Sequence, residues 1–363
     1  MKNIRRNSII IFIITGLILY FILKDNFKDI VSTLMDANLW WILAAVGIFL
    51  LYFLFDQMSF FLMTKQYQKD IKIRFILHLG VVTKFFNGVT PLASGGQPMQ
   101  IYELHKEGVS ISNGTNIVIQ NYIVFQIAFV AWAIIAYILN HAMHLFQSVP
   151  LLRELTMIGF VVNGIVLLVL FLISFSKNFN RTIVSWIINF LAKFKKKMNK
   201  EEELKKWNKN CDDYYENAQV LIKEPKVFLT CILCQFISLA LYFAIPFFIA
   251  YSIGVGRDLS LINTIVAGEY IYIMGCYVPI PGATGGMEYG FLGFFGNFLS
   301  GYSLSALMVL WRFLTYYLPT IIGAIVFNIG PGKDVKRAMI NGEIWHLFSF
   351  ELLYFTIKGC LDE

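Results

Sequence analysis

The chain contains the stretch Pro91-Leu92-Ala93-Ser94-Gly95-Gly96, and 190 positions later it contains Pro281-Gly282-Ala283-Thr284-Gly285-Gly286. Each copy follows an apolar run, and the two agree in residue type at five matching positions. In membrane hydrocarbon an unpaired backbone N–H or C=O costs several kcal/mol, so a broken Pro/Gly segment survives only inside protein or beside a wet cavity. Paired segments of this kind are typical of a transporter site between structural repeats. The alternative is two unrelated loops that each need glycine turns.

The composition indicates an integral membrane protein. Of 363 residues, 57% are hydrophobic and 15% are charged, and the mean hydropathy is +0.64. Soluble domains carry about 25% charged residues. About 20 apolar residues cross the hydrocarbon core as a helix. We therefore expect an all-α polytopic protein with about six transmembrane helices, at residues 9–23, 39–63, 115–139, 155–175, 227–253 and 303–328.

Two further apolar stretches, residues 75–90 and 260–278, run directly into the Pro/Gly stretches. They are predicted to be the first arms of two re-entrant hairpins. The second could equally be a full crossing. The run 9–23 follows a basic N-terminus, as in a signal peptide, but no small-residue cleavage site comes after it. We therefore expect residues 9–23 to be retained as the first helix.

The distribution of lysine and arginine predicts the orientation. Six spans that start inside place the N-terminus, the segment after residue 63, the loop 176–226 and the C-terminal tail in the cytoplasm, and these regions hold most of the basic residues. The outer segments hold only Lys24, Lys28, Arg153 and Arg257. The net charge of +7 therefore reflects topology and does not indicate nucleic-acid binding. On this topology the two hairpins enter from opposite faces, which predicts an inverted repeat.

The long loop 176–226 contains a basic amphipathic segment. Apolar residues recur at spacings of three and four over residues 180–195, and lysines follow at the end of the segment. Such a helix is expected to lie in the inner headgroup layer and to attract anionic lipid headgroups. The alternative is that it packs on the helix bundle and that its lysines only set the topology.

Five ionisable residues fall inside apolar runs, where such residues by default mark a pathway or a paired site. They are Asp56, Lys84, Glu269, Glu288 and Arg312. An unpaired arginine at the depth of Arg312 costs at least about 2.5 kcal/mol, so it needs a carboxylate, a carbonyl cage or a phosphate. Glu288 and Glu269 are its candidate partners. One interpretation is that Arg312 meets a lipid phosphate when the cavity opens; the other is a permanent ion pair that braces the hairpin.

The candidate substrate-binding residues lie on and around the two Pro/Gly stretches. They are Lys84, Asn87, Ser94, Gly95, Gly96, Gln97, Gln100, Glu269, Pro281, Gly285, Gly286, Glu288, Arg312 and Tyr316. The glutamine and asparagine side chains could alternatively serve only as hydrogen bonds between helices. The sequence shows no residue spacing typical of a metal site or a catalytic set. We therefore expect no metal, no cofactor and no catalytic residue.

Two longer motifs carry a family resemblance. Residues 90–108, with the sequence TPLASGGQPMQIYELHKEG, and residues 279–288, with the sequence PIPGATGGME, resemble the lysylphosphatidylglycerol synthase transmembrane family over about residues 5–330. The resemblance includes an arginine in the last span, at Arg312. It implies a multi-pass protein of the bacterial cytoplasmic membrane that moves or binds phospholipid. It also implies lysyl-phosphatidylglycerol as the best-known cargo and a relation to resistance against cationic antimicrobial peptides.

The chain departs from the family pattern in two ways. Many relatives place an acidic residue and an arginine where this chain has Gln97 and Gln100, so headgroup preference is not carried over. The chain also ends at Glu363, and no soluble aminoacyltransferase domain is expected in it. We therefore predict a lipid-translocation domain at 1–330 and a cytoplasmic tail at 331–363. Both termini are predicted to be cytoplasmic.

Several functional alternatives stay open at this point. The chain could be the membrane-embedded part of a phosphatidylglycerol lysyltransferase system, or a partner of a separate synthase. It could also be a transferase for lipid-linked substrates, or a lipid-binding scaffold that transports nothing. A homo-oligomer is a further option that the sequence leaves open.

Overall fold

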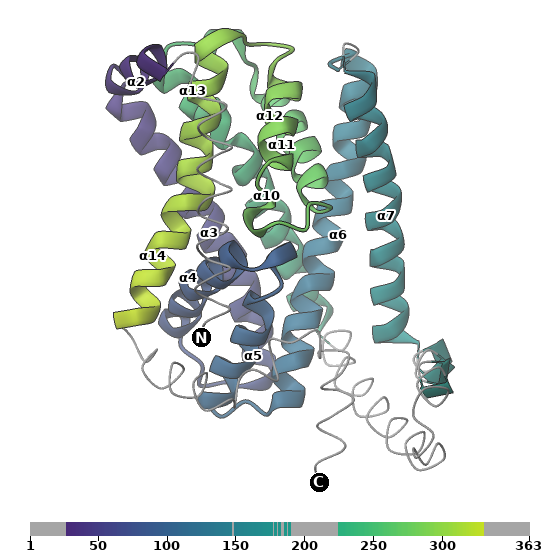
Figure 1. The fold of residues 1–363 in the computed structure, drawn as a ribbon. Helices are drawn as coiled ribbons and strands as arrows, with labels where there is room; N and C mark the ends of the chain where they lie inside the picture. Colours follow the sequence, from purple (N-terminus) through teal and green to yellow (C-terminus); the bar gives the residue numbers. More distant parts are fainter. Residues whose placement is uncertain are drawn as a thin grey trace.

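The computed structural model describes residues 27–146, 149–176 and 224–329, with a few short pieces between 178 and 189. The expected first helix at 9–23, most of the basic loop and the tail at 331–363 lie outside the described residues. Every regular element in the described part is helical (Figure 1). The main helices are α2 (Phe27–Met35), α3 (Leu39–Tyr67), α4 (Ile73–Val89), α5 (Gly96–Lys106), α6 (Ile111–Met143), α7 (Pro150–Phe175), α10 (Pro225–Ser252), α11 (Leu261–Gly275), α12 (Gly286–Phe295), α13 (Gly301–Arg312) and α14 (Leu318–Ile329).

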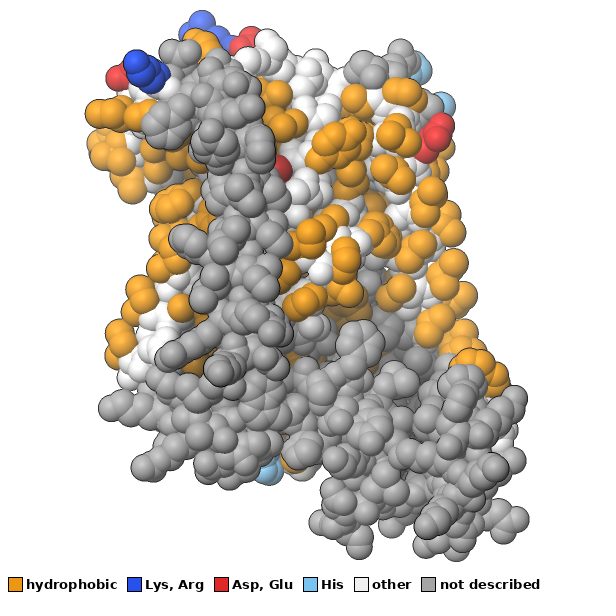
Figure 2. Space-filling view, viewed as in Figure 1, with side chains coloured by type: hydrophobic (Ala, Val, Ile, Leu, Met, Phe, Trp, Pro, Cys, Tyr) orange, Lys and Arg blue, Asp and Glu red, His pale blue; other side chains and the backbone are white. Residues whose placement is uncertain are grey.

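Five segments of the described chain are long and apolar enough to cross a membrane: α3, α6, α7, α10 and the joined pair α13–α14. They match five of the six predicted spans. Short polar caps begin several of the helices. Asn38 caps α3, Ser110 caps α6 and Ser260 caps α11, because each side chain accepts a hydrogen bond from a backbone amide of the first turn. Figure 2 shows hydrophobic side chains along both flanks and charged side chains near the end that carries α2.

The two predicted hairpins are present. Helix α4 turns at a short 3₁₀ segment, Pro91–Ala93, into α5, and α11 turns at a second one, Pro281–Ala283, into α12. The arms of each hairpin pack against each other. Residues 260–278 therefore form an arm and not a full crossing. In Figure 1 the α4–α5 hairpin occupies the lower half of the bundle and the α11–α12 hairpin occupies the upper half.

The packing follows an inverted repeat. One unit runs from α3 to α6 and the other from α10 to α14, with the hairpin in the same place of each. The equivalent helices α3 and α10 form the most extensive helix contact in the described structure. Helix α4 of the first hairpin packs on α14 of the other unit, and α11 of the second hairpin packs on α6. Helix α7 lies outside this repeat, against α6 and α11 (Figure 1).

Candidate functional site

The two Pro/Gly loops lie next to each other and adopt the same backbone turn. Residues of the segments Pro91–Ala93 and Pro281–Ala283 approach within 8 Å of each other, measured between Cα atoms. In the first loop Leu92 and Ala93 both have a φ of 53°. In the second, the equivalent Gly282 and Ala283 have φ values of 65° and 50°. A left-handed conformation is uncommon for residues other than glycine, so its recurrence at matched positions supports a true repeat over two unrelated loops.

The hydroxyl that follows each turn makes the same hydrogen bond. Ser94 Oγ donates to the carbonyl of Pro91 at 2.9 Å, and Thr284 Oγ1 donates to the carbonyl of Pro281 at 2.9 Å. The surroundings of the two turns differ, because Pro91 and Ser94 are exposed whereas Pro281 and Thr284 are buried. The first loop therefore faces open space and the second is enclosed by protein.

The start of α5 is held by side chains at the end of the preceding arm, α4. The amide of Gly96 donates to Asn87 Oδ1 at 2.9 Å, and the amide of Gly95 donates to Thr90 Oγ1 at 2.8 Å. A side chain on Gly96 would overlap the side chain of Asn87, which explains why glycine fits at this helix start. Asn87, Gly95 and Gly96, predicted as site residues, thus build the turn itself.

The start of α12 is held by a buried carboxylate that also pairs with Arg312. Glu288 Oε2 accepts a hydrogen bond from the amide of Gly285 at 2.6 Å. Its other oxygen, Oε1, lies 2.7 Å from Arg312 Nε. Arg312 Nη2 donates to the carbonyl of Gly282 at 2.9 Å. Both charged side chains are buried. Of the two candidate carboxylates, Glu288 is therefore the partner of Arg312, because it is the one that contacts the guanidinium.

Tyr316 links the second loop to the first hairpin. The Arg312 guanidinium carbon lies 4.6 Å from the centre of the Tyr316 ring, within cation–π range. The Tyr316 hydroxyl donates to the carbonyl of Gly88, at the end of α4, at 2.9 Å. Tyr316 belongs to a π-helical turn, Phe313–Tyr317, that joins α13 to α14. Such turns are rare and frequently occur at functional sites.

A second polar cluster surrounds Lys84, where α3, α4 and α10 meet. Lys84 Nζ donates to the Tyr52 hydroxyl at 2.6 Å and lies 3.7 Å from Asp56 Oδ2. Asp56 accepts two amide hydrogen bonds, from Gln57 Nε2 at 2.8 Å and from Gln235 Nε2 at 3.1 Å. The sequence prediction singled out Asp56 and Lys84 but missed Tyr52 and Gln235. The signal that could have found them is a polar side chain inside an otherwise apolar run.

The remaining predicted site residues take no part in the contacts described above. Glu269 is fully buried on α11, and neither carboxylate oxygen has a hydrogen-bond partner among the described residues. Gln97 and Gln100 lie half-buried on α5. Gly286 begins α12, where an added side chain would overlap Val278.

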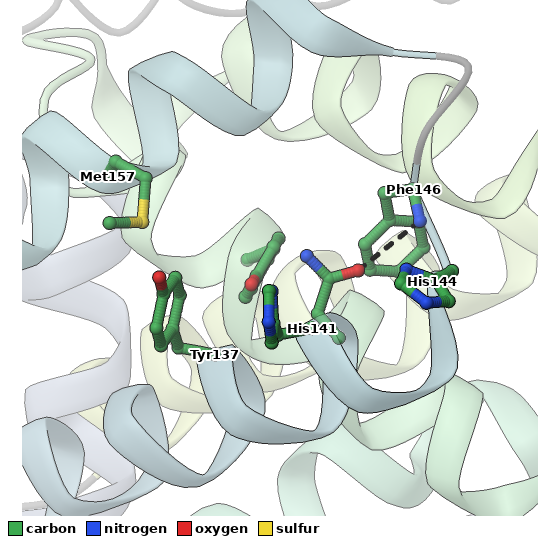
Figure 3. A pocket seen from close by; sticks show the side chains of 7 residues that line it. Tyr137, His141, His144, Phe146 and Met157 are labelled. Carbon is green, nitrogen blue, oxygen red and sulfur yellow. Dashed lines mark hydrogen bonds between the residues drawn. The ribbon is translucent and has the colours of Figure 1, made fainter.

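A separate cavity lies between α6, α7 and α11. It has a volume of about 220 Å³ and is lined by Tyr137, Asn140, His141, His144, Phe146, Met157 and Tyr270. Figure 3 shows Tyr137 and His141 on one helix and Met157 facing them across the opening. Asn140 Oδ1 accepts a hydrogen bond from the amide of Phe146 at 3.2 Å. None of these residues belongs to either Pro/Gly loop.

The fold and the meeting of two re-entrant loops define the class: an all-α, multi-pass membrane protein built as an inverted repeat. The chain belongs to the family described as Lysylphosphatidylglycerol synthase TM region, whose sequence profile matches residues 8–323. No curated protein matches the chain. Membership of this family supports a role connected with membrane lipid.

Proposed function

We propose that the chain translocates phospholipid across the bacterial cytoplasmic membrane, as a flippase, and that the headgroup passes the point where the two loops meet. The observation that carries this proposal is the contact between two loops that belong to hairpins of opposite direction. Inverted-repeat transporters build their substrate site at such a place, since it can open to either side. The family's connection with membrane lipid supports phospholipid as the class of cargo, and we take phosphatidylglycerol and its lysyl derivative as the first candidates.

In this proposal Arg312 and Glu288 form the closed state of the second loop. The pair holds the loop through the Gly282 carbonyl and the Gly285 amide. A phosphate that entered when the loop moved would compete with Glu288 for the guanidinium, which binds phosphate oxygens in a bidentate way. The same residues therefore support both a structural brace and a later contact with the headgroup.

The rest of the proposal concerns placement. Residues 1–330 form the translocation domain, and 331–363 form a cytoplasmic tail. Both termini lie in the cytoplasm, where the basic loop 176–226 contacts anionic lipid of the inner leaflet. A separate synthase would supply any lysylated lipid.

Proteoliposomes test the function directly. Purified protein is reconstituted with tail-labelled fluorescent phosphatidylglycerol in the inner leaflet, and outer-leaflet exposure is followed over time, with protein-free vesicles as control. We expect faster exposure in the protein-containing vesicles. Vesicles that match the control would contradict the flippase function. The same sample, supplied with lysyl-tRNA, is assayed for lysyl-phosphatidylglycerol, whose formation would favour the transferase alternative.

A further inference from the structure

Two cations in the interior of the bundle differ in how firmly they are held. Arg312 makes two directed hydrogen bonds, to Glu288 and to the Gly282 carbonyl, and its side chain is 3% exposed. The ring of Tyr316 lies beside its guanidinium. Arg312 can therefore take a new anion only after the second loop has moved.

Lys84 has more freedom. Its side chain is 24% exposed, although it lies within the apolar helix α4. An ammonium has three donors, and among the described residues it makes one hydrogen bond, to the neutral Tyr52 hydroxyl. The distance of 3.7 Å to Asp56 is a loose ion pair and not a hydrogen bond.

Asp56 has partners other than Lys84. Its two oxygens already accept hydrogen bonds from the side-chain amides of Gln57 and Gln235. Removing one member of a buried pair is costly when it strands the other charge. Here two amides bond both oxygens and the Asp56 side chain is 22% exposed, so a turn of Lys84 toward a new anion costs less than breaking a fully buried pair. The Tyr52 hydroxyl also keeps its own hydrogen, which can donate to a ligand oxygen.

The position of Lys84 joins this cluster to the loops. Lys84 lies one turn before Gly88, whose carbonyl accepts the hydrogen bond from Tyr316. On the other side of the cluster, the rings of Tyr52 and Tyr242 lie 5.1 Å apart.

We infer that Lys84 and the Tyr52 hydroxyl form the first binding point for the phosphate group of the translocated phospholipid, with Asp56 as the resting counter-ion of Lys84. This inference rests on the proposed function. It assigns first contact to the hairpin with the exposed loop, and it makes Arg312 a second contact that is reached only when the other loop opens.

The first test is a set of variants in the fluorescent phosphatidylglycerol assay. Lys84→Gln removes the charge, and Lys84→Arg keeps it. Lys106→Gln removes one positive charge from an exposed pair at the end of α5 and serves as the matched control. We expect Lys84→Gln to lower the rate at least tenfold, Lys84→Arg to keep most of it, and Lys106→Gln to match the parent. A folded Lys84→Gln variant that moves lipid at the parental rate would overturn the inference.

The second test needs no variant. The parent protein in detergent is treated with an amine-acetylating reagent, and modification of Lys84 is read by peptide mass spectrometry. Added phosphatidylglycerol should slow modification of Lys84 severalfold and leave Lys106 unchanged, whereas inorganic phosphate at the same concentration should have little effect. Equal protection by inorganic phosphate, or no protection by lipid, would refute a lipid site. A parent that moves no lipid but shows this protection would contradict only the proposed function.

Discussion

Replacing Arg312 by alanine should destabilise the protein severely, because it strands a buried carboxylate. The change removes the 2.7 Å contact with Glu288 and the 2.9 Å hydrogen bond to the Gly282 carbonyl. Breaking a buried pair on one side costs about 3–5 kcal/mol. At about 2–4 °C per kcal/mol for a chain above 150 residues, the melting temperature should fall by roughly 10 °C. Tryptophan fluorescence of purified protein in mild detergent measures this shift.

A double variant separates the ion pair from other effects of the substitution. Arg312→Met combined with Glu288→Gln removes both charges, and the glutamine can still accept the hydrogen bond from Gly285. Because no charge is then stranded, the double variant should recover to within about 1–2 kcal/mol of the parent. An Arg312→Ala variant that melts like the parent, or a double variant that melts as early as Arg312→Ala, would refute the pairing energetics.

Arg312→Lys connects this stability to function. An ammonium can keep the charge near Glu288 but cannot also reach the Gly282 carbonyl with the geometry of a planar guanidinium. If Arg312 also meets phosphate during transport, Arg312→Lys should transport lipid more slowly than its stability alone explains. A variant as stable and as active as the parent would exclude the phosphate contact.

Three further changes test other parts of the structure. Gly282→Ala should lower the free energy of unfolding by about 2–4 kcal/mol, because its φ is 65° and a side chain would overlap the Tyr316 ring. Gly301→Ala is the control: it has the same φ but nothing within 4 Å, so it should lower the free energy by only about 1 kcal/mol in the same thermal unfolding measurement. On a cysteine-free background, single cysteines at Asn199 and His141 should label only from inside and only from outside, respectively; labelling from one face would refute the predicted orientation. When the protein is expressed in a host that makes no aminoacylated lipids, lipid extracts should still contain no aminoacylated lipid. Lysyl-phosphatidylglycerol in these extracts would overturn the transport assignment.

The sequence predicts the hairpins well because their cause is local. Proline and glycine at matched offsets determine where each arm turns, and the cost of a lone charge in hydrocarbon requires a partner for Arg312. Both predictions rest on the chemistry of single residues. The structure adds that the partner of Arg312 is Glu288, whose other carboxylate oxygen caps the start of α12.

The Lys84 cluster was less predictable because its partners come from distant parts of the chain. Gln235 reaches Asp56 across 179 positions of sequence, through the packing of α3 on α10. No periodicity in either helix specifies that contact. Glu269 was predicted as a candidate partner of Arg312, but it is fully buried on α11 and its carboxylate has no hydrogen-bond partner in the described part of the chain. Its surroundings depend on how α11 is rotated in the bundle, which the sequence does not specify.

In the proposed function, the short second arms of the hairpins shorten the distance over which a headgroup would cross hydrocarbon. Helix α5 has 11 residues and α12 has 10. At 1.5 Å per residue they are about 16 and 15 Å long. Each arm is thus about half as long as the hydrocarbon layer is thick, which is about 30 Å. In the proposed function, hairpins that enter from opposite faces bring backbone dipoles and hydroxyl groups toward the middle of the bilayer. A translocated headgroup would then cross two thin barriers in series, and its peak desolvation cost would be lower than for one continuous slab of hydrocarbon.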